Sequence, residues 1–203
     1  MSDCTTVLLL AFDEMELLDF AGPYEVFTTA ARVHARRQGG AGPRFQLITA
    51  SADGRPVRAR AGLAISVDHA LAQAPATDWL LVPGGVIDGV LAQPATLAEL
   101  ARRAGDAAIT ASVCTGAFVL AAAGIVTDQA VTTHWEDAED LAQRFPALQV
   151  RPERRWIDNG RSVTSAGIAA GIDMALHLVA RAAGPELAQA TARQMDYPWS
   201  PSP

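Results

Sequence analysis

Continuous apolar runs of strand length alternate with segments of helical periodicity along most of the chain. Residues 5–12, 45–50 and 79–82 are apolar without alternation, which is typical of strands covered on both faces. Apolar positions at helical spacing predict helices at residues 24–37, 95–105, 136–145, 167–182 and 185–195. This order predicts an α/β fold with a mostly parallel sheet and helices on both faces.

Shorter segments complete the predicted elements. Residues 54–68 alternate loosely between apolar and polar positions, which predicts a small hairpin or an edge ribbon. Asp158-Asn159-Gly160 is a tight-turn sequence between two short predicted strands. The other expected segments are strands at 107–113, 130–135, 148–151, 156–157 and 162–164, a glycine-rich turn at 38–43, and an extended proline-rich tail at 197–203.

Cys114 lies where a buried strand is predicted to turn sharply into a helix that continues to Gly124. Ser112, Thr115 and Gly116 are small residues around it, and such a turn needs small neighbours, as in the nucleophile elbow of hydrolases. The N–H groups at the start of the helix would favour a thiolate and would stabilise negative charge on a substrate. The alternative is that Cys114 is a small side chain of the core.

Two other signals follow predicted strands. Asp19 is a carboxylate set among apolar residues, which is either a helix cap at the surface or a buried acid kept for chemistry. Gly84 and Gly85 end the strand 79–82, where a double glycine either makes an ordinary turn or offers free N–H groups to a ligand. Since ligands bind at the carboxyl ends of parallel strands, Asp19, Gly84, Gly85 and Cys114 are expected to converge there.

Composition favours a single folded domain and disfavours several kinds of partner and site. The 203 residues suit one domain, 1–203, and half of them are hydrophobic, which predicts a folded globule with an aliphatic core. The net charge of −6 disfavours nucleic acid and anionic membranes as partners. Cys4 and Cys114 form no CxxC motif and the four histidines are widely spaced, so neither a metal site nor a disulfide framework is expected. The N-terminus does not look like a signal peptide, and a cytoplasmic location is expected.

Five motifs together resemble the DJ-1/PfpI superfamily of class I glutamine-amidotransferase-like domains over nearly the whole chain. They are LDFAGP at 18–23, VPGG at 82–85, SVCTG at 112–116, TTHW at 132–135 and AGIAAGID at 166–173. The resemblance implies a flavodoxin-like three-layer sandwich. Within the superfamily it is closest to isonitrile hydratases and to the sensor half of AraC-like regulators.

The resemblance also implies roles for individual residues. Cys114 matches the nucleophile of the family, Asp19 the acid that faces it, and Thr115 a residue implicated in hydratase activity, whose N–H would join Gly85 in an oxyanion hole. His134 matches a histidine of the superfamily, although a structural role beside Trp135 is favoured. Thr115 stands where the protease members carry histidine, so protease activity is not expected.

The resulting hypothesis is a cofactor-independent isonitrile hydratase that acts on a small molecule, with a homodimer suggested by relatives. Cys114 would attack the isocyano carbon, and Asp19 would protonate the adduct to a thioimidate and then activate water. The alternatives are a glyoxalase or deglycase acting on 2-oxoaldehydes, which would need a base such as His134, and a redox or ligand sensor without turnover.

Overall fold

The computed structural model describes residues 4–37, 39, 44–199 and 201 of the chain. The strands are β1 (Thr5–Leu10), β2 (Phe45–Ser51), β3 (Val57–Arg58), β4 (Ala64–Ile65), β5 (His69–Ala70), β6 (Trp79–Val82), β7 (Ile109–Val113), β8 (Ala130–Val131), β9 (Gln149–Val150), β10 (Trp156–Asp158) and β11 (Ser162–Ser165). The α-helices are α1 (Leu17–Arg37), α2 (Asp88–Leu91), α3 (Pro94–Asp106), α4 (Gly116–Ala122), α5 (Ala138–Arg144), α6 (Ala170–Ala183) and α7 (Pro185–Gln194).

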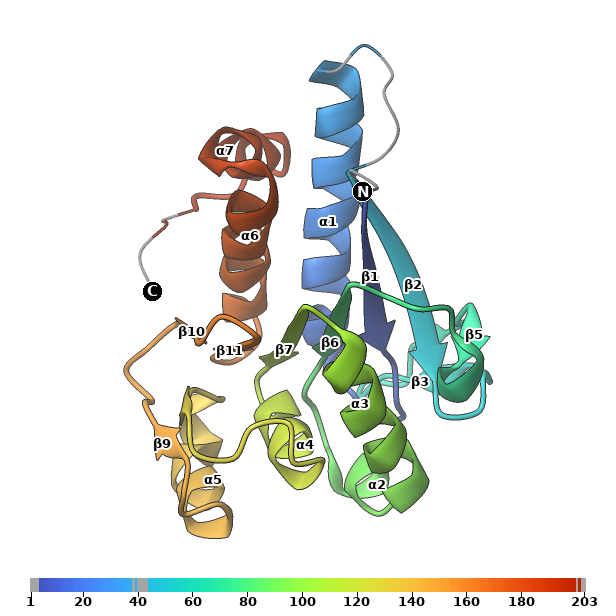
Figure 1. The fold of residues 1–203 in the computed structure, drawn as a ribbon, viewed down its shortest axis with the longest axis vertical. Coiled ribbons are helices and arrows are strands. Elements are labelled where there is room, and N and C mark those ends of the chain that lie inside the picture. Colours follow the sequence, from blue (N-terminus) through green and yellow to red (C-terminus); the bar gives the residue numbers. More distant parts are fainter. Residues whose placement is uncertain (1–3, 38, 40–43, 200, 202–203) are drawn as a thin grey trace.

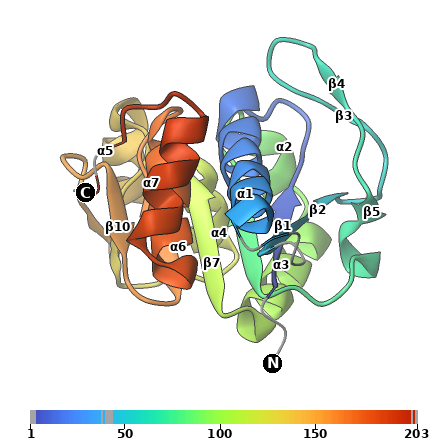
Figure 2. The ribbon, with the colours of Figure 1, turned by 90° about the horizontal axis from the view of Figure 1, so that it is seen from above.

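The main sheet confirms the predicted architecture (Figure 1). Its seven strands have the order β10-β11-β7-β6-β1-β2-β5, and every neighbouring pair is parallel except β10 and β11. Helices α1, α6 and α7 cover one face, and α2, α3 and α4 cover the other (Figure 2). The buried, continuously apolar strands follow from this double cover, because each strand is removed from water on both sides.

The order of the strands places a crevice beside β1. The chain passes from β1 to β2 on one side and later returns to β6 on the other side. The loops that follow β1 and β6 meet at the carboxyl edge of the sheet, where the Glu16 N–H donates to the Gly84 carbonyl (2.8 Å) and the Val86 N–H to the Glu14 carbonyl (3.0 Å). The loop after β7 lies next to them, since the Gly85 N–H donates to the Thr115 Oγ1 atom. Ligands of open α/β sheets bind at such a switch point.

Helix α1 differs from its predicted bounds. It begins at Leu17 rather than after Pro23, so that Pro23 lies inside it. Proline removes the hydrogen bond to the carbonyl of residue 19 and normally ends or kinks a helix. Here Phe20, Val26 and Phe27 are buried under the helix, and their burial offsets that loss.

Other predictions are confirmed in outline. The segment 54–68 forms the antiparallel pair β3 and β4, and the turn at 158–160 joins β10 to β11. The predicted strand 130–135 is shorter, and a 3₁₀ turn, Trp135–Asp137, follows it. The turn predicted at 38–43 lies almost entirely outside the described residues, and of the tail 197–203 the structure describes residues 197–199 and 201.

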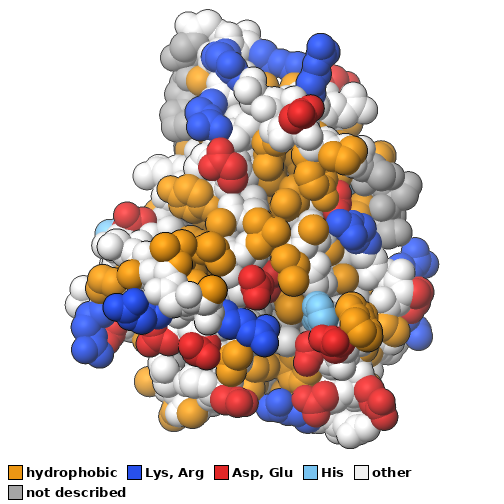
Figure 3. Space-filling view, turned by 180° about the vertical axis from the view of Figure 1, so that it is seen from behind, with side chains coloured by type: hydrophobic (Ala, Val, Ile, Leu, Met, Phe, Trp, Pro, Cys, Tyr) orange, Lys and Arg blue, Asp and Glu red, His pale blue; other side chains and the backbone are white. Residues whose placement is uncertain are grey.

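The surface carries exposed apolar side chains. On the face drawn in Figure 3, hydrophobic side chains gather in the middle, with charged side chains above and below them. No helix in the described part of the chain is long and apolar enough to cross a membrane.

Candidate active site

Cys114 stands at the turn between β7 and α4, as the sequence predicts. Its φ of 56° lies in the left-handed region, which residues other than glycine rarely adopt. Neighbouring segments hold this backbone: the Cys114 N–H donates to the carbonyls of Ser165 (3.1 Å) and Ala166 (3.3 Å), and the Thr133 hydroxyl donates to the Cys114 carbonyl (2.8 Å). The side chain is 7% exposed, so the turn presents the sulfur to a nearly closed space.

Asp19 is a buried acid and not a surface cap. It lies in the first turn of α1 and is fully buried. Its Oδ2 atom accepts a hydrogen bond from the Gly84 N–H (3.1 Å), which joins the loop after β6 to the start of α1. Its Oδ1 atom has no partner of regular hydrogen-bond geometry among the described residues. A buried carboxyl with an oxygen that lacks a regular hydrogen bond is a candidate for a functional role.

Burial governs the protonation of Asp19. The pKa of this carboxyl is raised from 3.8 to about 7, chiefly by removal from water and in smaller part by the negative charge of the nearby Glu16. The Gly84 N–H, the Cys114 side chain and the Ile168 backbone act in the opposite direction. The carboxyl is therefore able to gain and lose its proton near neutral pH.

The expected thiolate is not supported. Burial, and next the negative charge of Asp19, raise the pKa of the Cys114 thiol from 9.0 to about 12, although the Thr115 N–H lowers it. The prediction of a thiolate rested on the N–H groups at the start of the helix, which lower the pKa of the thiol. Burial of the sulfur raises that pKa, and the sequence does not show how buried the sulfur is. The raised pKa favours the protonated thiol at neutral pH.

The two glycines after β6 do not offer free N–H groups. The Gly84 N–H is taken by Asp19, and the Gly85 N–H donates to the Thr115 Oγ1 atom (2.8 Å). The same hydroxyl donates to the Gly85 carbonyl (2.9 Å). The expected oxyanion hole from the N–H groups of Thr115 and Gly85 is thus not available in this conformation. Thr115 instead ties the Cys114 turn to the loop that holds Asp19.

Replacing Thr115 by Val is expected to lower the free energy of unfolding by about 1–3 kcal/mol, because the partly buried Gly85 N–H and carbonyl lose their partner. Thr115→Ser keeps the hydroxyl and is expected to retain most of that stability. Urea unfolding of the three proteins measures the difference. Equal stability of the Val and Ser variants would contradict the bridging role.

His134 has a structural setting. Its Nδ1 atom accepts from the Glu136 N–H (3.4 Å), so the His134 side chain caps the 3₁₀ turn Trp135–Asp137. The same atom lies 3.5 Å from the Asp137 Oδ2 atom. The ring lies against Gly167, where a Cβ would come within 2.1 Å of it. Of the two interpretations of His134, this geometry favours the structural one.

Sequence reasoning gave no role to three residues that touch the site. Thr133 holds the Cys114 carbonyl, and Ile168, whose backbone acts on Asp19, has a φ of 48° that is rare for a β-branched residue. Glu16 places a second negative charge near Asp19. Thr133 and Ile168 belong to two of the five motifs, and those motifs were the only signal for them.

Apolar side chains adjoin the site residues along the chain. Leu18 precedes Asp19, Val86 follows Gly85, Trp135 follows His134 and Ile168 follows Gly167, and each of the four is at least 38% exposed. No group of three or more His, Cys, Asp or Glu residues in the described part of the chain could hold a metal ion. Cys114 and Asp19 are themselves buried, so the exposed apolar side chains belong to their neighbours in the sequence.

Residues 5–181 match the model of the DJ-1/PfpI family. The chain belongs to the DJ-1/PfpI family. The crystal structure of a ThiJ/PfpI family protein from Pseudomonas syringae superimposes with a TM-score of 0.83 at 28% identity, covering 97% of this chain and 76% of that one. The family assignment agrees with the resemblance drawn from the five motifs.

Two kinds of curated DJ-1/PfpI relative are similar to this chain. An isonitrile hydratase from Pseudomonas putida is 33% identical over 195 residues, which is 96% of this chain and 78% of that protein. The HTH-type transcriptional regulator CdhR from Pseudomonas aeruginosa is 33% identical over 178 residues, 88% of this chain. The match spans about half of the regulator's length (51%).

Proposed function

We propose that this protein is an isonitrile hydratase, which adds water to an isocyanide to give an N-substituted formamide. The observation that carries the proposal is the buried Asp19 carboxyl, with a pKa of about 7, set against a cysteine at a strained turn. The similarity to an isonitrile hydratase over 96% of the chain supports it. Exposed apolar side chains next to Asp19, Gly85 and His134 in the sequence would suit an apolar isocyanide with few hydrogen-bonding groups.

The reactive form of the pair holds one proton. With pKa values of about 7 for Asp19 and about 12 for Cys114, a thiol beside a carboxylate predominates between these two values. The carboxylate is the base that takes the thiol proton as the sulfur attacks. The thiolate then forms only during the reaction, because burial and the charge of Asp19 raise the pKa of the resting thiol.

The first half of the reaction forms a thioimidate. The sulfur of Cys114 bonds to the terminal isocyano carbon, and the thiol proton passes through Asp19 to that same carbon. The product is R–N=CH–S–Cys114, with Asp19 again a carboxylate. No proton enters from outside, since the pair supplies the one that the carbon gains.

The second half adds water and releases the formamide. The water oxygen bonds to the thioimidate carbon while Asp19 takes a proton from the water. Asp19 then passes that proton to the nitrogen, which gives R–NH–CH(OH)–S–Cys114. The C–S bond of the adduct then breaks, the hydroxyl proton returns to the sulfur, and R–NH–CHO leaves. The sum is one isocyanide and one water consumed for each formamide.

The proposal is tested with cyclohexyl isocyanide as substrate. Purified protein is expected to form N-cyclohexylformamide, detected by mass spectrometry, and the Cys114→Ala variant is expected to form none. A folded wild-type protein that yields no formamide from cyclohexyl isocyanide or from smaller alkyl isocyanides would sink the proposal.

The pH dependence of kcat/KM is a separate prediction. We expect a plateau above about pH 8 and a tenfold loss for each pH unit below about 7, because protonation of Asp19 removes the base that accepts the thiol proton. Initial rates from pH 5 to pH 9 measure the profile. Rates independent of pH over this range would contradict the role of Asp19 as the base.

A sensing function is the second candidate, because transcriptional regulators are as similar to this chain as the hydratase is. A sensor would bind a ligand near Cys114 without turnover. A glyoxalase activity is less favoured, since the Nδ1 atom of His134 is engaged within its own turn. Methylglyoxal consumption that depends on His134 would reverse that preference.

We also propose that the protein forms a homodimer. Large apolar side chains are exposed on a single copy of the chain, and their burial against a second copy would favour association. They include Leu18, Tyr24, Val86, Trp135 and Ile168. Sedimentation equilibrium is expected to give twice the mass of one chain. A monomer at micromolar concentration would contradict the proposal.

A further inference from the structure

A large cavity lies beside the site and is separate from it. Its volume is about 930 Å³, and it is enclosed by the end of β1, the segment from the end of β2 to β3, and the junction of α2 and α3. Neither Asp19, Gly84, Cys114 nor Thr115 lines it. A volume of this size accommodates a small organic molecule.

The floor of the cavity is apolar. Leu10, Phe12, Val57 and Val90 line it and are themselves buried, with at most 7% exposure. The charged residues that line it, Asp13, Asp53, Arg55 and Arg58, are exposed and form its rim. The cavity therefore suits a ligand with an apolar body and a polar end.

The acids of the rim are already engaged. Asp53 accepts from the Arg55 guanidinium (2.6 Å) and from the Arg55 N–H (3.0 Å). Asp13 accepts from the N–H of Arg58 (2.7 Å). Asp53 is thus paired with Arg55, whereas Asp13 has only this backbone partner and no ion pair within the described residues.

The rim also offers hydrogen-bond donors, from Arg58 and Gln93. The Arg58 guanidinium donates to the Gly62 carbonyl (3.1 Å) and has no ion pair within the described residues. Across the cavity, the Gln93 Oε1 atom accepts from the Thr96 hydroxyl (3.0 Å), so the polar group that Gln93 leaves over is its amide NH₂. A cation and an amide donor above an apolar floor match a carboxylate that carries an apolar chain.

We propose that this cavity binds small organic carboxylates with an apolar body, through Arg58 and Gln93. The carboxylate accepts hydrogen bonds from both side chains, and the apolar body lies over Phe12, Val57 and Val90. This site is distinct from the isocyanide site and takes a ligand of opposite character, since an isocyanide bears no charge.

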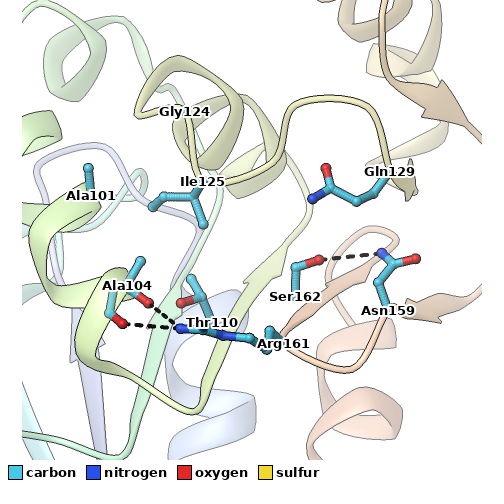
Figure 4. A pocket seen from close by; sticks show the side chains of 10 residues that line it. Ala101, Ala104, Thr110, Gly124, Ile125, Gln129, Asn159, Arg161 and Ser162 are labelled. Atoms are coloured by element: carbon cyan, nitrogen blue, oxygen red, sulfur yellow. Dashed lines mark hydrogen bonds between the residues drawn. The ribbon is translucent and has the colours of Figure 1, made fainter.

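A second cavity shows that an arginine in the lining does not by itself make a carboxylate site. At the other end of the sheet, a cavity of about 380 Å³ is lined by Thr110, Gln129, Asn159, Arg161 and Ser162, among others (Figure 4). The Arg161 guanidinium there donates to the carbonyls of Ala104, Gly105 and Ala107, at the end of α3. It caps a helix, whereas Arg58 keeps donors for a ligand.

Octanoate is the probe for the proposed site, with octan-1-ol and octylamine as matched controls. Isothermal titration of the Cys114→Ala protein, which has no nucleophile, is expected to show saturable binding of one octanoate per chain. The alcohol and the amine are expected to bind at least tenfold more weakly. Because the assay does not involve turnover, its result is independent of whether the protein is a hydratase.

Variants on both walls locate the binding. Arg58→Gln is expected to weaken octanoate binding 10- to 100-fold, the range expected for a lost charge-assisted hydrogen bond. Arg60→Gln, on the same hairpin but outside the cavity lining, is the control and is expected to bind as the parent does. Gly89→Met fills the cavity from α2, where a Cβ meets no atom within 4 Å, and is expected to abolish binding.

Gly105→Met is the control for the added bulk, since Gly105 also has open space and lines the second cavity. Circular dichroism confirms that each variant is folded. Absence of saturable octanoate binding would overturn the proposal, as would equal binding of octylamine. Octanoate binding that survives both Arg58→Gln and Gly89→Met would place the ligand elsewhere and would also overturn it.

Discussion

Asp19→Asn is expected to lower kcat/KM for isocyanide hydration by about 10²- to 10⁴-fold, the usual contribution of a general acid–base group. The amide cannot take the thiol proton, so the sulfur of Cys114 stays protonated at the moment of attack. The Asn oxygen can still accept from the Gly84 N–H, which preserves the loop geometry. The acid limb of the pH profile is expected to disappear together with the carboxyl.

The same substitution is expected to stabilise the fold at high pH. The Asp19 pKa is raised from 3.8 to about 7, so the folded protein binds this proton more tightly than the unfolded chain does. The contribution of Asp19 to stability is therefore present below pH 4 and falls by about 1.4 kcal/mol per pH unit from there to about pH 7. Asn at position 19 avoids that loss.

Urea unfolding at pH 5 and pH 8 measures this effect. The advantage of Asp19→Asn over wild type is expected to be larger at pH 8 than at pH 5. Asp106→Asn is the matched control, because Asp106 is exposed and its ion pair with Arg102 lies at the surface, so a small effect is expected at both pH values. An Asp19→Asn protein that is less active but no more stable at pH 8 would indicate that the carboxyl is not buried as described.

Gly85→Ala is expected to be the most destabilising single change near the site, by about 3 kcal/mol or more. Its φ of 135° is strained for any residue with a side chain, and an added Cβ would lie 2.4 Å from the Glu14 carbonyl oxygen and 2.5 Å from the Glu16 backbone nitrogen. These are backbone atoms, which cannot move aside without breaking the contact of the two loops. Activity is expected to fall with it, since the displaced loop carries Gly84, the donor to Asp19.

Gly89→Ala serves as the control for the glycine substitution. Gly89 lies four residues further on, in α2, where a Cβ meets no atom within 4 Å. It is expected to be neutral or to stabilise by up to about 1 kcal/mol, as alanine does within a helix. Thermal unfolding of both variants measures the contrast, and equal melting temperatures would contradict the close approach of the two loops.

The architecture could be predicted because its signals are local. The continuous apolar runs at β1 and β6 reflect burial on both faces, and the parallel order then places the residues after each strand at one edge. That rule alone brought Asp19, Gly84 and Cys114 together. Short elements such as β5 and α2, with two and four residues, carry too little periodicity to be recognised.

The electrostatics of the site could not be predicted in the same way. Whether Asp19 caps a helix or is buried depends on where α1 begins, and Pro23 indicated a later start than the one observed. The use of the Gly85 N–H depends on a hydroxyl from another loop, that of Thr115. The pKa of the Cys114 thiol depends on how much water the surrounding chain excludes, which no spacing in the sequence expresses.

The left-handed backbone at Cys114 has a consequence for how this chain would change over time. A residue with a side chain costs roughly 1–2 kcal/mol in that conformation, and glycine would occupy it without penalty. A lineage that needed only the scaffold would gain from drifting to glycine at this position. Keeping a thiol at this position therefore costs conformational free energy. The hydrogen bonds to the Cys114 N–H and carbonyl offset that cost.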